Sequence, residues 1–310
     1  MELSVIIPVF NEKESLPILF EELQIELKKY NDWEIIFIDD GSSDGSAEYI
    51  QELVNDYNHI KLIKFYKNFG KSAALSEGFK ESKGDLIFTM DADLQDDPIE
   101  ITNLINKLNE GFDLVSGWKK KRNDPLSKTL PSKLFNFITR FFTGVQIHDF
   151  NCGLKGYRKA VVKTLDIYGG RHRYIPALAA QKEFKISEII VNHRERMFGE
   201  TKYGGSRFLH GFFDLLTILF LNKYTQQPLH LFGFFGLVSS VFGLFAEIIV
   251  LYYKIYLGEP FANHLALLIF GVMLITIGIQ FFSIGLLGEM MAKSSQNQEN
   301  RVKNIIKSKA

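Results

Sequence analysis

A run of carboxylates follows an apolar segment in the first third of the chain. The apolar segment is Leu86-Ile87-Phe88-Thr89-Met90, and the acidic string behind it is Asp91-Ala92-Asp93-Leu94-Gln95-Asp96-Asp97-Pro98. One alanine separates Asp91 from Asp93, so in an extended segment both side chains project from the same side. Two such carboxylates suit Mg²⁺ or Mn²⁺, which keep coordination positions open for substrate phosphates. The string therefore predicts a divalent-metal site at the end of a buried strand; the alternative is a solvated loop that is merely acidic.

Three further clusters each follow an expected strand. Pro8-Val9-Phe10-Asn11-Glu12 could form one wall of a base-binding slot. In Asp39-Asp40-Gly41-Ser42-Ser43-Asp44, a carboxylate at a strand end could accept a hydrogen bond from a nucleobase N–H or a ribose hydroxyl. Lys67-Asn68-Phe69-Gly70-Lys71 is a basic turn at a helix start, suited to phosphate or nucleotide. Taken singly, each cluster is also compatible with an ordinary strand–turn–helix joint, a capping loop or a surface turn.

The elements that must position these clusters alternate between strand and helix. The apolar runs predict strands at 3–9, 34–38, 60–65, 86–90 and 113–117. Helical spacing predicts helices at 12–30, from the 39–45 loop to about 56, at 72–83 and at 99–109, with Asn11 as the first cap. This alternation predicts an α/β fold: a parallel sheet with helices on both faces. Because ligands of such sheets bind at the carboxyl ends of the strands, the four clusters are expected to meet at one edge.

Two long apolar segments lie in the last third of the chain. Residues 229–253 contain one acid, Glu247, and residues 265–288 contain no charged residue. Each is long enough to cross a hydrocarbon core of about 30 Å as a helix. Two spans leave both chain ends on one side, and the flanking lysines and arginines predict that this side is the cytoplasm. The alternative is a pair of buried helices in a soluble protein, and Glu247 is expected to face a partner helix or an interface.

Four parts of the chain are expected. They are a domain of ordinary charge density at residues 1–205, a juxtamembrane amphipathic helix at 206–228, a two-helix membrane anchor at 229–290 and a basic tail at 291–310. Residues 132–142 and 208–221 are dense in Phe and Leu, which favours amphipathic helices lying on or against the bilayer. Core helices are the alternative for both.

Bulk properties narrow the classes of function. The 310 residues carry 36 basic and 36 acidic side chains, so the net charge is zero and nothing global points to nucleic acid. Cys152 is the only cysteine, which excludes an intrachain disulfide and fits a reducing cytoplasm. Residues 1–4 lack the basic segment and long apolar run of a signal peptide, so none is expected.

Taken together, the order and spacing of the four clusters resemble the family-2 glycosyltransferases of the GT-A (Rossmann-like) fold. More narrowly, the chain resembles the polyprenyl-phosphate glycosyltransferases, the dolichyl-phosphate mannose synthases and their bacterial undecaprenyl-phosphate relatives. The resemblance covers essentially the whole chain, both apolar segments included. Its most specific pieces are the acidic string, Asp149-Phe150-Asn151-Cys152-Gly153 with Tyr157-Arg158, and Gly199-Glu200-Thr201-Lys202-Tyr203-Gly204.

The resemblance implies roles for the residues that match the family's motifs. Those expected to bind the nucleotide are Pro8, Phe10, Glu12, Asp40, Lys71 and Asp91. Asp93 and Gln95 would bind a Mg²⁺ or Mn²⁺ ion that bridges the diphosphate. Asp93, Asp149 and Arg196 would act at the reacting centre, although Asp149 could instead cap residues 151–153. Those expected near the lipid phosphate are Lys119, Lys128, Ser132 and Lys202.

Several positions depart from the family's pattern. Phe10 stands where Tyr is commoner, and Thr201 where Ser is. Lysine replaces the usual arginine at Lys67, Lys119 and Lys128, giving point charges instead of bidentate forks. Lys119 and Lys128 could also be solvated surface lysines, and the lipid-phosphate role has competitors in Lys120, Lys121 and Arg122.

The reaction that the resemblance implies is transfer of a sugar from a UDP- or GDP-sugar to a polyprenyl phosphate at the cytoplasmic leaflet of a bacterial membrane. A lipid phosphate is already ionised near pH 7, so it can attack the anomeric carbon without a strong base, inverting the configuration. The demands are then positioning and charge. The resemblance also suggests homo-oligomers. Two alternatives are a processive polysaccharide synthase, which would carry Gln-x-x-Arg-Trp and more spans, and a non-catalytic nucleotide-sugar sensor or scaffold.

Overall fold

The computed structural model describes residues 2–120, 126–198 and 227–295, with side chains left out at 126–131 and 292–295. The chain divides into two compact units, Met1–Leu216 and Thr217–Ala310. The boundary expected between 205 and 206 lies outside the described residues, as do the helix expected at 208–221 and the tail beyond 295. Each unit is described separately.

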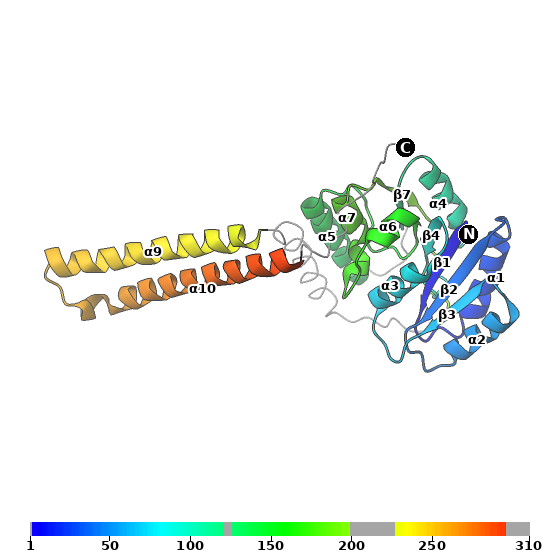
Figure 1. Cartoon of the computed structure of the whole chain (residues 1–310), viewed down its shortest axis with the longest axis horizontal. Coiled ribbons are helices and arrows are strands. Elements are labelled where there is room, and N and C mark those ends of the chain that lie inside the picture. Colours follow the sequence, from blue (N-terminus) through cyan, green and yellow to red (C-terminus); the bar gives the residue numbers. More distant parts are fainter. Residues whose placement is uncertain (1, 121–125, 199–226, 296–310) are drawn as a thin grey trace, which may run out of the picture. The chain divides into compact units, whose positions relative to one another are not determined.

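In the described part of the first unit, a seven-stranded sheet has helices on both faces (Figure 1). Its strands are β1 (Leu3–Val9), β2 (Trp33–Asp39), β3 (Ile60–Lys64), β4 (Leu86–Thr89), β5 (Leu114–Trp118), β6 (Lys155–Arg158) and β7 (Ile186–Ile190). Its helices are α1 (Leu16–Leu27), α2 (Ser46–Asp56), α3 (Lys71–Glu81), α4 (Glu100–Asn109), α5 (Leu126–Thr143), α6 (Lys159–Thr164), the 3-10 turn η1 (Arg171–Tyr174) and α7 (Ile175–Gln181). All five expected strands are present.

The five predicted strands run in the same direction, as expected for a parallel sheet, but the complete sheet is mixed. The strand order is β3-β2-β1-β4-β6-β5-β7, and β6 runs antiparallel between β4 and β5. Neither β6 nor β7 was predicted, because both are short and have weak apolar patterns. The insertion of β6 matters for the site: since its direction is reversed, β6 starts at the edge where β4 and β5 end.

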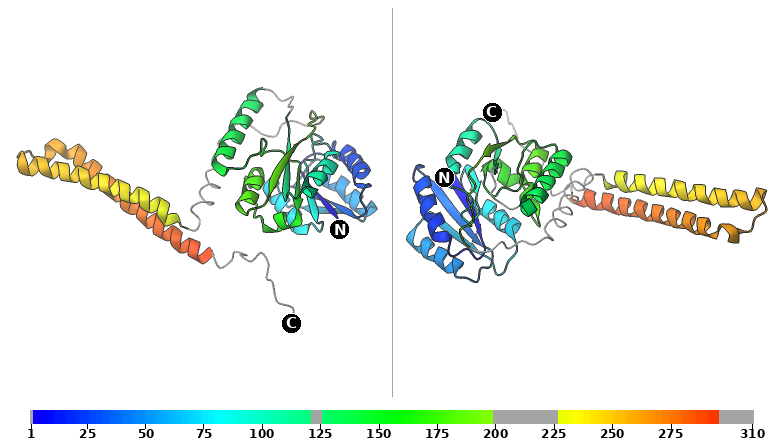
Figure 2. Two further views of the ribbon diagram at one scale, coloured as in Figure 1. Left: turned by 90° about the horizontal axis from the view of Figure 1, so that it is seen from above. Right: turned by 180° about the vertical axis from the view of Figure 1, so that it is seen from behind.

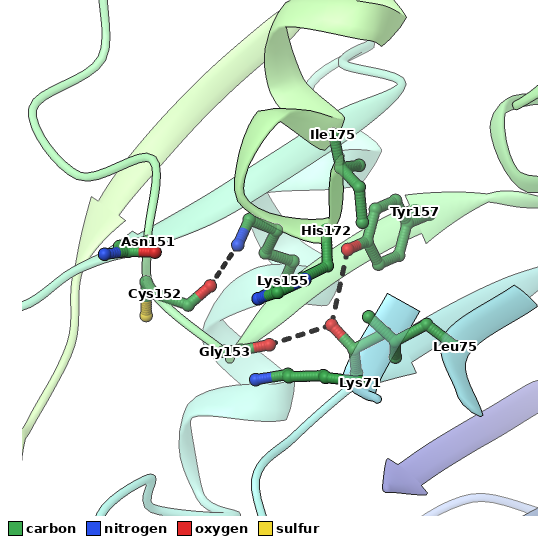
Figure 3. Close-up of a pocket in the computed structure, with 10 residues that line it drawn as sticks. Lys71, Leu75, Asn151, Cys152, Gly153, Lys155, Tyr157, His172 and Ile175 are labelled. Atoms are coloured by element: carbon green, nitrogen blue, oxygen red, sulfur yellow. Dashed lines mark hydrogen bonds between the residues drawn. The ribbon is translucent and has the colours of Figure 1, made fainter. Parts of the chain in front are cut away.

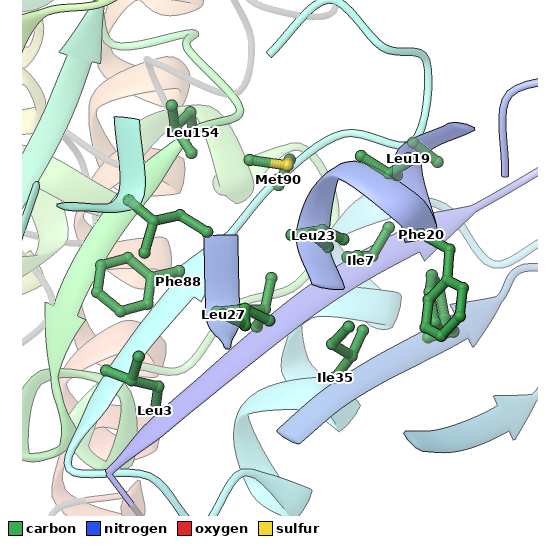
Figure 4. Packing of buried hydrophobic residues seen from close by; sticks show 14 of the residues in the cluster. Leu3, Ile7, Leu19, Phe20, Leu23, Leu27, Ile35, Phe88, Met90 and Leu154 are labelled. Carbon is green, nitrogen blue, oxygen red and sulfur yellow. The ribbon is translucent and has the colours of Figure 1, made fainter. Parts of the chain in front are cut away.

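Two hydrophobic clusters cover the two faces of the sheet. On one face, Leu19, Leu23 and Leu27 of α1 pack against Leu3 and Ile7 of β1 (Figure 4). On the other, helices α3, α6 and α7 pack against Ile6, Ile36, Ile38, Ile87 and Tyr157. Burial on both faces accounts for the continuous apolar runs of the central strands, and it holds the loops at the strand ends on a rigid base.

The first helix begins later than expected. Asn11 does not cap it: its φ is +54°, and its side-chain Oδ1 accepts a hydrogen bond from the Ser43 N–H at 2.8 Å. The helix starts at Leu16 after the N-cap residue Ser15, with Pro17 in the first turn, where a missing N–H costs nothing. Residues 10–15 therefore form a loop beside the second strand.

The helix expected at 132–142 is confirmed and is longer than predicted, spanning Leu126–Thr143. Phe135 contacts the ring of Tyr174, whereas Phe137 and Phe141 are exposed. One side of α5 therefore packs on the protein, and the other presents aromatic side chains outward.

The second unit is a hairpin of two long apolar helices, α9 (Pro228–Tyr256) and α10 (Leu265–Ser295), joined through the 3-10 turn η2 (Phe261–His264) (Figure 2). Both are long and apolar enough to span a membrane, as predicted. They approach closely through glycines: a Cβ added at Gly243 would lie 2.7 Å from the Gly271 carbonyl oxygen. The side chain of Glu247 packs beside Gly271, and its Oε1 has no hydrogen-bond partner among the described residues.

Candidate active site

All four sequence clusters meet at one edge of the sheet. Strands β1 to β4 are parallel, so the loops that follow them share an edge. Because Thr89 pairs with Lys155, the segment 149–154 before β6 arrives there too. The parallel pairing of Trp118 with Ile190 brings Lys119 and residues 191–196 to the same edge.

The loops after β1 and β2 are fastened to each other. The Asn11 N–H donates to Ser42 Oγ at 2.9 Å, and the Glu12 N–H donates to Ser46 Oγ at 3.0 Å. These bonds place the partly buried Pro8, Phe10 and Glu12 beside the 39–44 loop. The two clusters form one continuous wall.

Asp40 connects this wall to the basic turn. Its Oδ1 accepts a hydrogen bond from the Phe69 N–H at 2.7 Å, and its Oδ2 accepts one from the Gly70 N–H at 2.9 Å. Asp40 is buried. The Asp40 carboxylate therefore orients the 67–71 turn.

Asp91 is paired with Lys71 at the start of α3. Burial alone would raise the pKa of Asp91, but the charges of Lys71 and Lys119 outweigh it and lower that pKa to about 2. Gly153 backs onto the same carboxylate: a Cβ added there would lie 2.7 Å from Asp91 Cγ. Only glycine leaves room for Asp91 in this position.

Asp93 faces a different partner. Its Oδ2 lies 2.6 Å from Arg196 Nη2, and its Oδ1 accepts a hydrogen bond from the Gln95 N–H at 3.2 Å. The expectation of an extended segment was wrong: residues 92–94 bend, and Leu94 has φ +61°. After the bend, the string runs toward residues 193–196, and the backbones of Asp96 and His193 pair there as a single antiparallel β-bridge. The bend therefore lets Asp91 and Asp93 contact different cationic side chains.

The donor set of the string fits a hard divalent cation. Burial and the negative charges of Asp91 and Asp96 raise the pKa of Asp93 to about 6, against the opposing effect of Arg196. The raised pKa reflects burial first and the neighbouring carboxylates second. The described residues contain no group of three or more His, Cys, Asp or Glu that could hold an ion by themselves. An ion at Asp93 and Gln95 would therefore take further oxygen ligands from substrate phosphate or water.

Lys119 is buried within an ion pair. Its Nζ lies 2.9 Å from Asp96 Oδ1, and the side chains are 12% and 0% exposed. Burial alone would lower the pKa of Lys119, but Asp96 raises it above its ordinary value. Lys119 is therefore not a solvated surface lysine, and binding a lipid phosphate would require it to share its charge with Asp96.

Asp149 and Ser132 are the other expected site residues whose side chains are described. Asp149 is 1% exposed, and its Oδ1 accepts a hydrogen bond from the Asn151 N–H at 3.0 Å, which is the capping contact considered as its alternative role. Ser132 is half-buried on α5. The side chain of Lys128, and Lys202 with the rest of the 199–204 motif, lie outside the described residues.

Three residues at this edge were not predicted from sequence. Arg194 bridges Asp97 at 2.8 Å and Glu22 at 2.7 Å. Lys155 is 3% exposed, and its Nζ donates to the Cys152 carbonyl oxygen (Figure 3). His172 lines the same small pocket, its Nδ1 2.9 Å from Ser72 Oγ. The sequence signal for Lys155 is a lysine between the apolar residues Leu154 and Tyr157. That signal can be recognised only once β6 is known to be a buried strand.

Comparison with known proteins gives the family. The family model named glycosyl transferase family 2 matches residues 4–166. Undecaprenyl-phosphate 4-deoxy-4-formamido-L-arabinose transferase of Salmonella choleraesuis (strain SC-B67) is 37% identical over 294 residues, covering 94% of this chain and 88% of that protein. The protein of the same name from Salmonella paratyphi B (strain ATCC BAA-1250 / SPB7) has the same identity and coverage. The chain belongs to glycosyl transferase family 2.

Solved structures agree on the fold of this family-2 glycosyltransferase. Glucosyl-3-phosphoglycerate synthase from Mycobacterium tuberculosis, in complex with phosphoglyceric acid, has a TM-score of 0.57 at 18% identity and covers 70% of this chain and 79% of that one. The same enzyme in complex with Mn²⁺ and UDP-glucose has a TM-score of 0.54 at 17% identity, covering 71% and 78%. The expected GT-A sheet is thus confirmed. The family match includes the acidic string and every expected nucleotide residue, whereas Arg196 and Lys202 lie beyond it.

Proposed function

We propose that this glycosyltransferase moves a sugar from a nucleotide sugar to a polyprenyl phosphate, with undecaprenyl phosphate as the acceptor. The observation that carries the proposal is the 37% identity to undecaprenyl-phosphate sugar transferases over 94% of the chain, a length that takes in both the catalytic sheet and the apolar hairpin. The sugar itself is left open, because relatives at this identity can differ in the donor they use.

The nucleotide binds along the wall made by the first three loops. Pro8 and Phe10 offer apolar surface to the base, with Glu12 and Asp40 as hydrogen-bond acceptors for base or ribose. Lys71 and Asp91 lie where the diphosphate would follow. The support is their common position at the carboxyl ends of β1 to β4.

Asp93 and Gln95 would hold a Mg²⁺ or Mn²⁺ ion, which would take its further oxygen ligands from substrate phosphate or water. A bound ion supplies charge stabilisation to the departing nucleoside diphosphate. Arg196, whose Nη2 lies 2.6 Å from Asp93 Oδ2, is the proposed contact for a phosphate oxygen of donor or acceptor.

The acceptor phosphate needs positioning more than activation. Its own negative charge makes it the nucleophile, so the residues near Asp149 orient it toward the anomeric carbon from the side opposite the leaving diphosphate, and the product is inverted. Lys119, Lys128, Ser132 and Lys202 are the proposed contacts for this phosphate. Asp149, buried and bonded to Asn151, stabilises positive charge that develops on the sugar.

The membrane supplies the acceptor. The hairpin α9–α10 anchors the enzyme in a bacterial cytoplasmic membrane, with residues 1–205 and the tail in the cytoplasm and reaction at the cytoplasmic leaflet. Exposed Phe137 and Phe141 on α5 lie against lipid. A homo-oligomer is part of the same proposal.

The test uses purified full-length protein in detergent with undecaprenyl phosphate, Mg²⁺ or Mn²⁺, and a panel of UDP- and GDP-sugars. Mass spectrometry of the lipid fraction should find one sugar joined to the lipid phosphate, and EDTA should abolish the product. Nucleotide-sugar binding with no transfer from any donor would favour a binding protein instead. Repeated addition of sugars would favour a processive synthase.

A further inference from the structure

A small pocket lies behind Asp91, and apart from Lys71 the proposed function gives its lining residues no role. Its lining includes Lys71, Asn151, Gly153, Lys155 and His172 (Figure 3). The pocket lies between the first turn of α3, the start of β6 and the 3-10 turn η1. It has room for a water-sized group, but not for a phosphate or a sugar ring.

Lys155 is the unexplained group in this pocket. The side chain is almost completely buried, and among the described residues its Nζ has one hydrogen-bond acceptor, the Cys152 carbonyl oxygen. No carboxylate of the described chain forms an ion pair with it, because the nearby Asp91 is paired with Lys71. A lysine nitrogen has further N–H groups to satisfy, and leaving them unmatched in a buried place costs free energy.

Among the described residues, none of the other polar groups that line the pocket accepts a hydrogen bond from Lys155 Nζ. Thr89 Oγ1 already donates to the Gly153 carbonyl oxygen at 2.8 Å. His172 is held by Ser72, whose Oγ accepts a hydrogen bond from the backbone N–H of His172 at 3.1 Å and lies 2.9 Å from its Nδ1. Burial and the charges of Lys71 and Arg173 lower the pKa of His172 well below its ordinary value, so the imidazole is neutral at pH 7. Lys155 therefore dominates the pocket as a hydrogen-bond donor.

We propose that Lys155 is a specificity-determining residue that donates a hydrogen bond to one oxygen substituent of the transferred sugar. This rests on the proposed function, which puts the diphosphate beside Asp91 and Asp93. Gly153 lines the pocket and packs against the Asp91 carboxylate, so the proposed diphosphate site and the pocket share a wall, and the sugar of a bound donor would lie next to the pocket. The size of the pocket selects a protruding oxygen, whether of a hydroxyl, a carbonyl or a carboxylate.

The experiment combines enzyme variants with donor analogues in a thermodynamic cycle, in which each enzyme is tested with each donor. The enzymes are wild type, Lys155→Met and, as a control, Lys163→Met, since Lys163 also donates to backbone carbonyls, those of Phe79 and Lys80, but lies outside the pocket. The donors are the nucleotide sugar that the wild type uses and analogues that each lack one ring oxygen substituent. The readouts are kcat/KM and, independently of turnover, donor affinity by calorimetry.

With wild type, one analogue should lose about 10- to 100-fold in kcat/KM, because it leaves the Lys155 donor unpaired. Lys155→Met should show a similar loss with the parent donor and no further loss with that analogue, while its affinity for the free nucleoside diphosphate stays unchanged. Lys163→Met should behave as wild type. The proposal is overturned if Lys155→Met lowers kcat/KM by the same factor for the parent donor and for every analogue. It is also overturned if the variant loses as much affinity for the free nucleoside diphosphate as for the parent donor, since either result means a structural role.

Failure of the proposed function would be distinguishable. If wild type transfers no sugar at all, the nucleotide sugar that it binds most tightly serves as the parent donor, and calorimetry compares it with its analogues in wild type and Lys155→Met. A parent-over-analogue preference that vanishes in Lys155→Met would then support the pocket assignment by itself, and an unchanged preference would contradict it.

Discussion

Four aspartates of the acidic string have four different cationic partners. The pairs are Asp91 with Lys71, Asp93 with Arg196 at 2.6 Å, Asp96 with Lys119 at 2.9 Å, and Asp97 with Arg194 at 2.8 Å. The outer two pairs, at Asp96 and Asp97, join the string to β5 and to the 191–196 segment. The pairs at Asp91 and Asp93 face the proposed nucleotide site. Aspartates in one short string therefore have different roles.

Replacing Asp93 with Asn should reduce sugar transfer by at least about 100-fold. The physical reason is loss of the proposed metal ligand, since a bound ion contributes several kcal/mol to stabilising the leaving group, and each 1.4 kcal/mol is about tenfold in rate. The measurement is the initial rate over a range of Mn²⁺ concentrations. Asp97→Asn is the matched control and should keep most activity; equal losses in both variants would contradict a metal role for Asp93.

The Asp96–Lys119 pair makes a prediction about stability. Removing one partner of a buried ion pair costs about 3–5 kcal/mol, because the other charge is left uncompensated. Asp96→Asn and Lys119→Met should therefore each lower the unfolding temperature of the detergent-purified protein. The double variant should be more stable than the sum of the two losses predicts. Strict additivity, measured by circular dichroism on heating, would show that the two residues do not interact.

Among the elements, the hairpin α9–α10 depends on close approach of two helices. A Cβ at Gly243 would lie 2.7 Å from the Gly271 carbonyl oxygen and 2.9 Å from the Ile275 nitrogen. Small residues at such crossings let helices pack by van der Waals contact in lipid, where the hydrophobic effect does not drive association.

Gly243→Ala should therefore destabilise the hairpin by about 1–3 kcal/mol, the range for overpacked contacts. Gly233→Ala is the matched control on the same helix, because its Cβ would meet the nearest atom at 3.6 Å, an ordinary contact. Thermal aggregation of both variants in detergent should separate them, with Gly243→Ala aggregating at a lower temperature. Equal behaviour would mean that the helices are not this close in the membrane.

For the whole molecule, the topology can be tested with the chain's own chemistry. Cys152, the single cysteine, is buried, so the wild type should not react with a membrane-impermeant maleimide. Leu257→Cys, in the turn between the long helices, should react in intact cells, because the proposed topology puts this turn outside. Ile25→Cys, exposed on α1, should react only after the cells are permeabilised. The opposite pattern would reverse the orientation.

The sequence alone determined the elements whose signals are local. Apolar runs identified β1 to β5, because strands buried on both faces exclude polar residues. Helix boundaries were less certain: Asn11 looked like a cap, yet its side chain bonds across to Ser43, a partner that lies 32 positions away in the chain. The two apolar hairpin helices were the simplest case, since length and composition suffice to identify them.

Which residues meet was decided only by the tertiary structure. The acidic string and its cationic partners are far apart in the chain. The local sequence therefore does not predict that Asp96 pairs with Lys119 or that Asp93 pairs with Arg196. The reversed strand β6 has the largest effect, because it carries Asp149, Gly153 and Lys155 to the edge where β4 ends. Side-chain chemistry at the site can therefore be listed from sequence, but its pairing and burial follow from strand order, which depends on how the whole sheet buries its two faces.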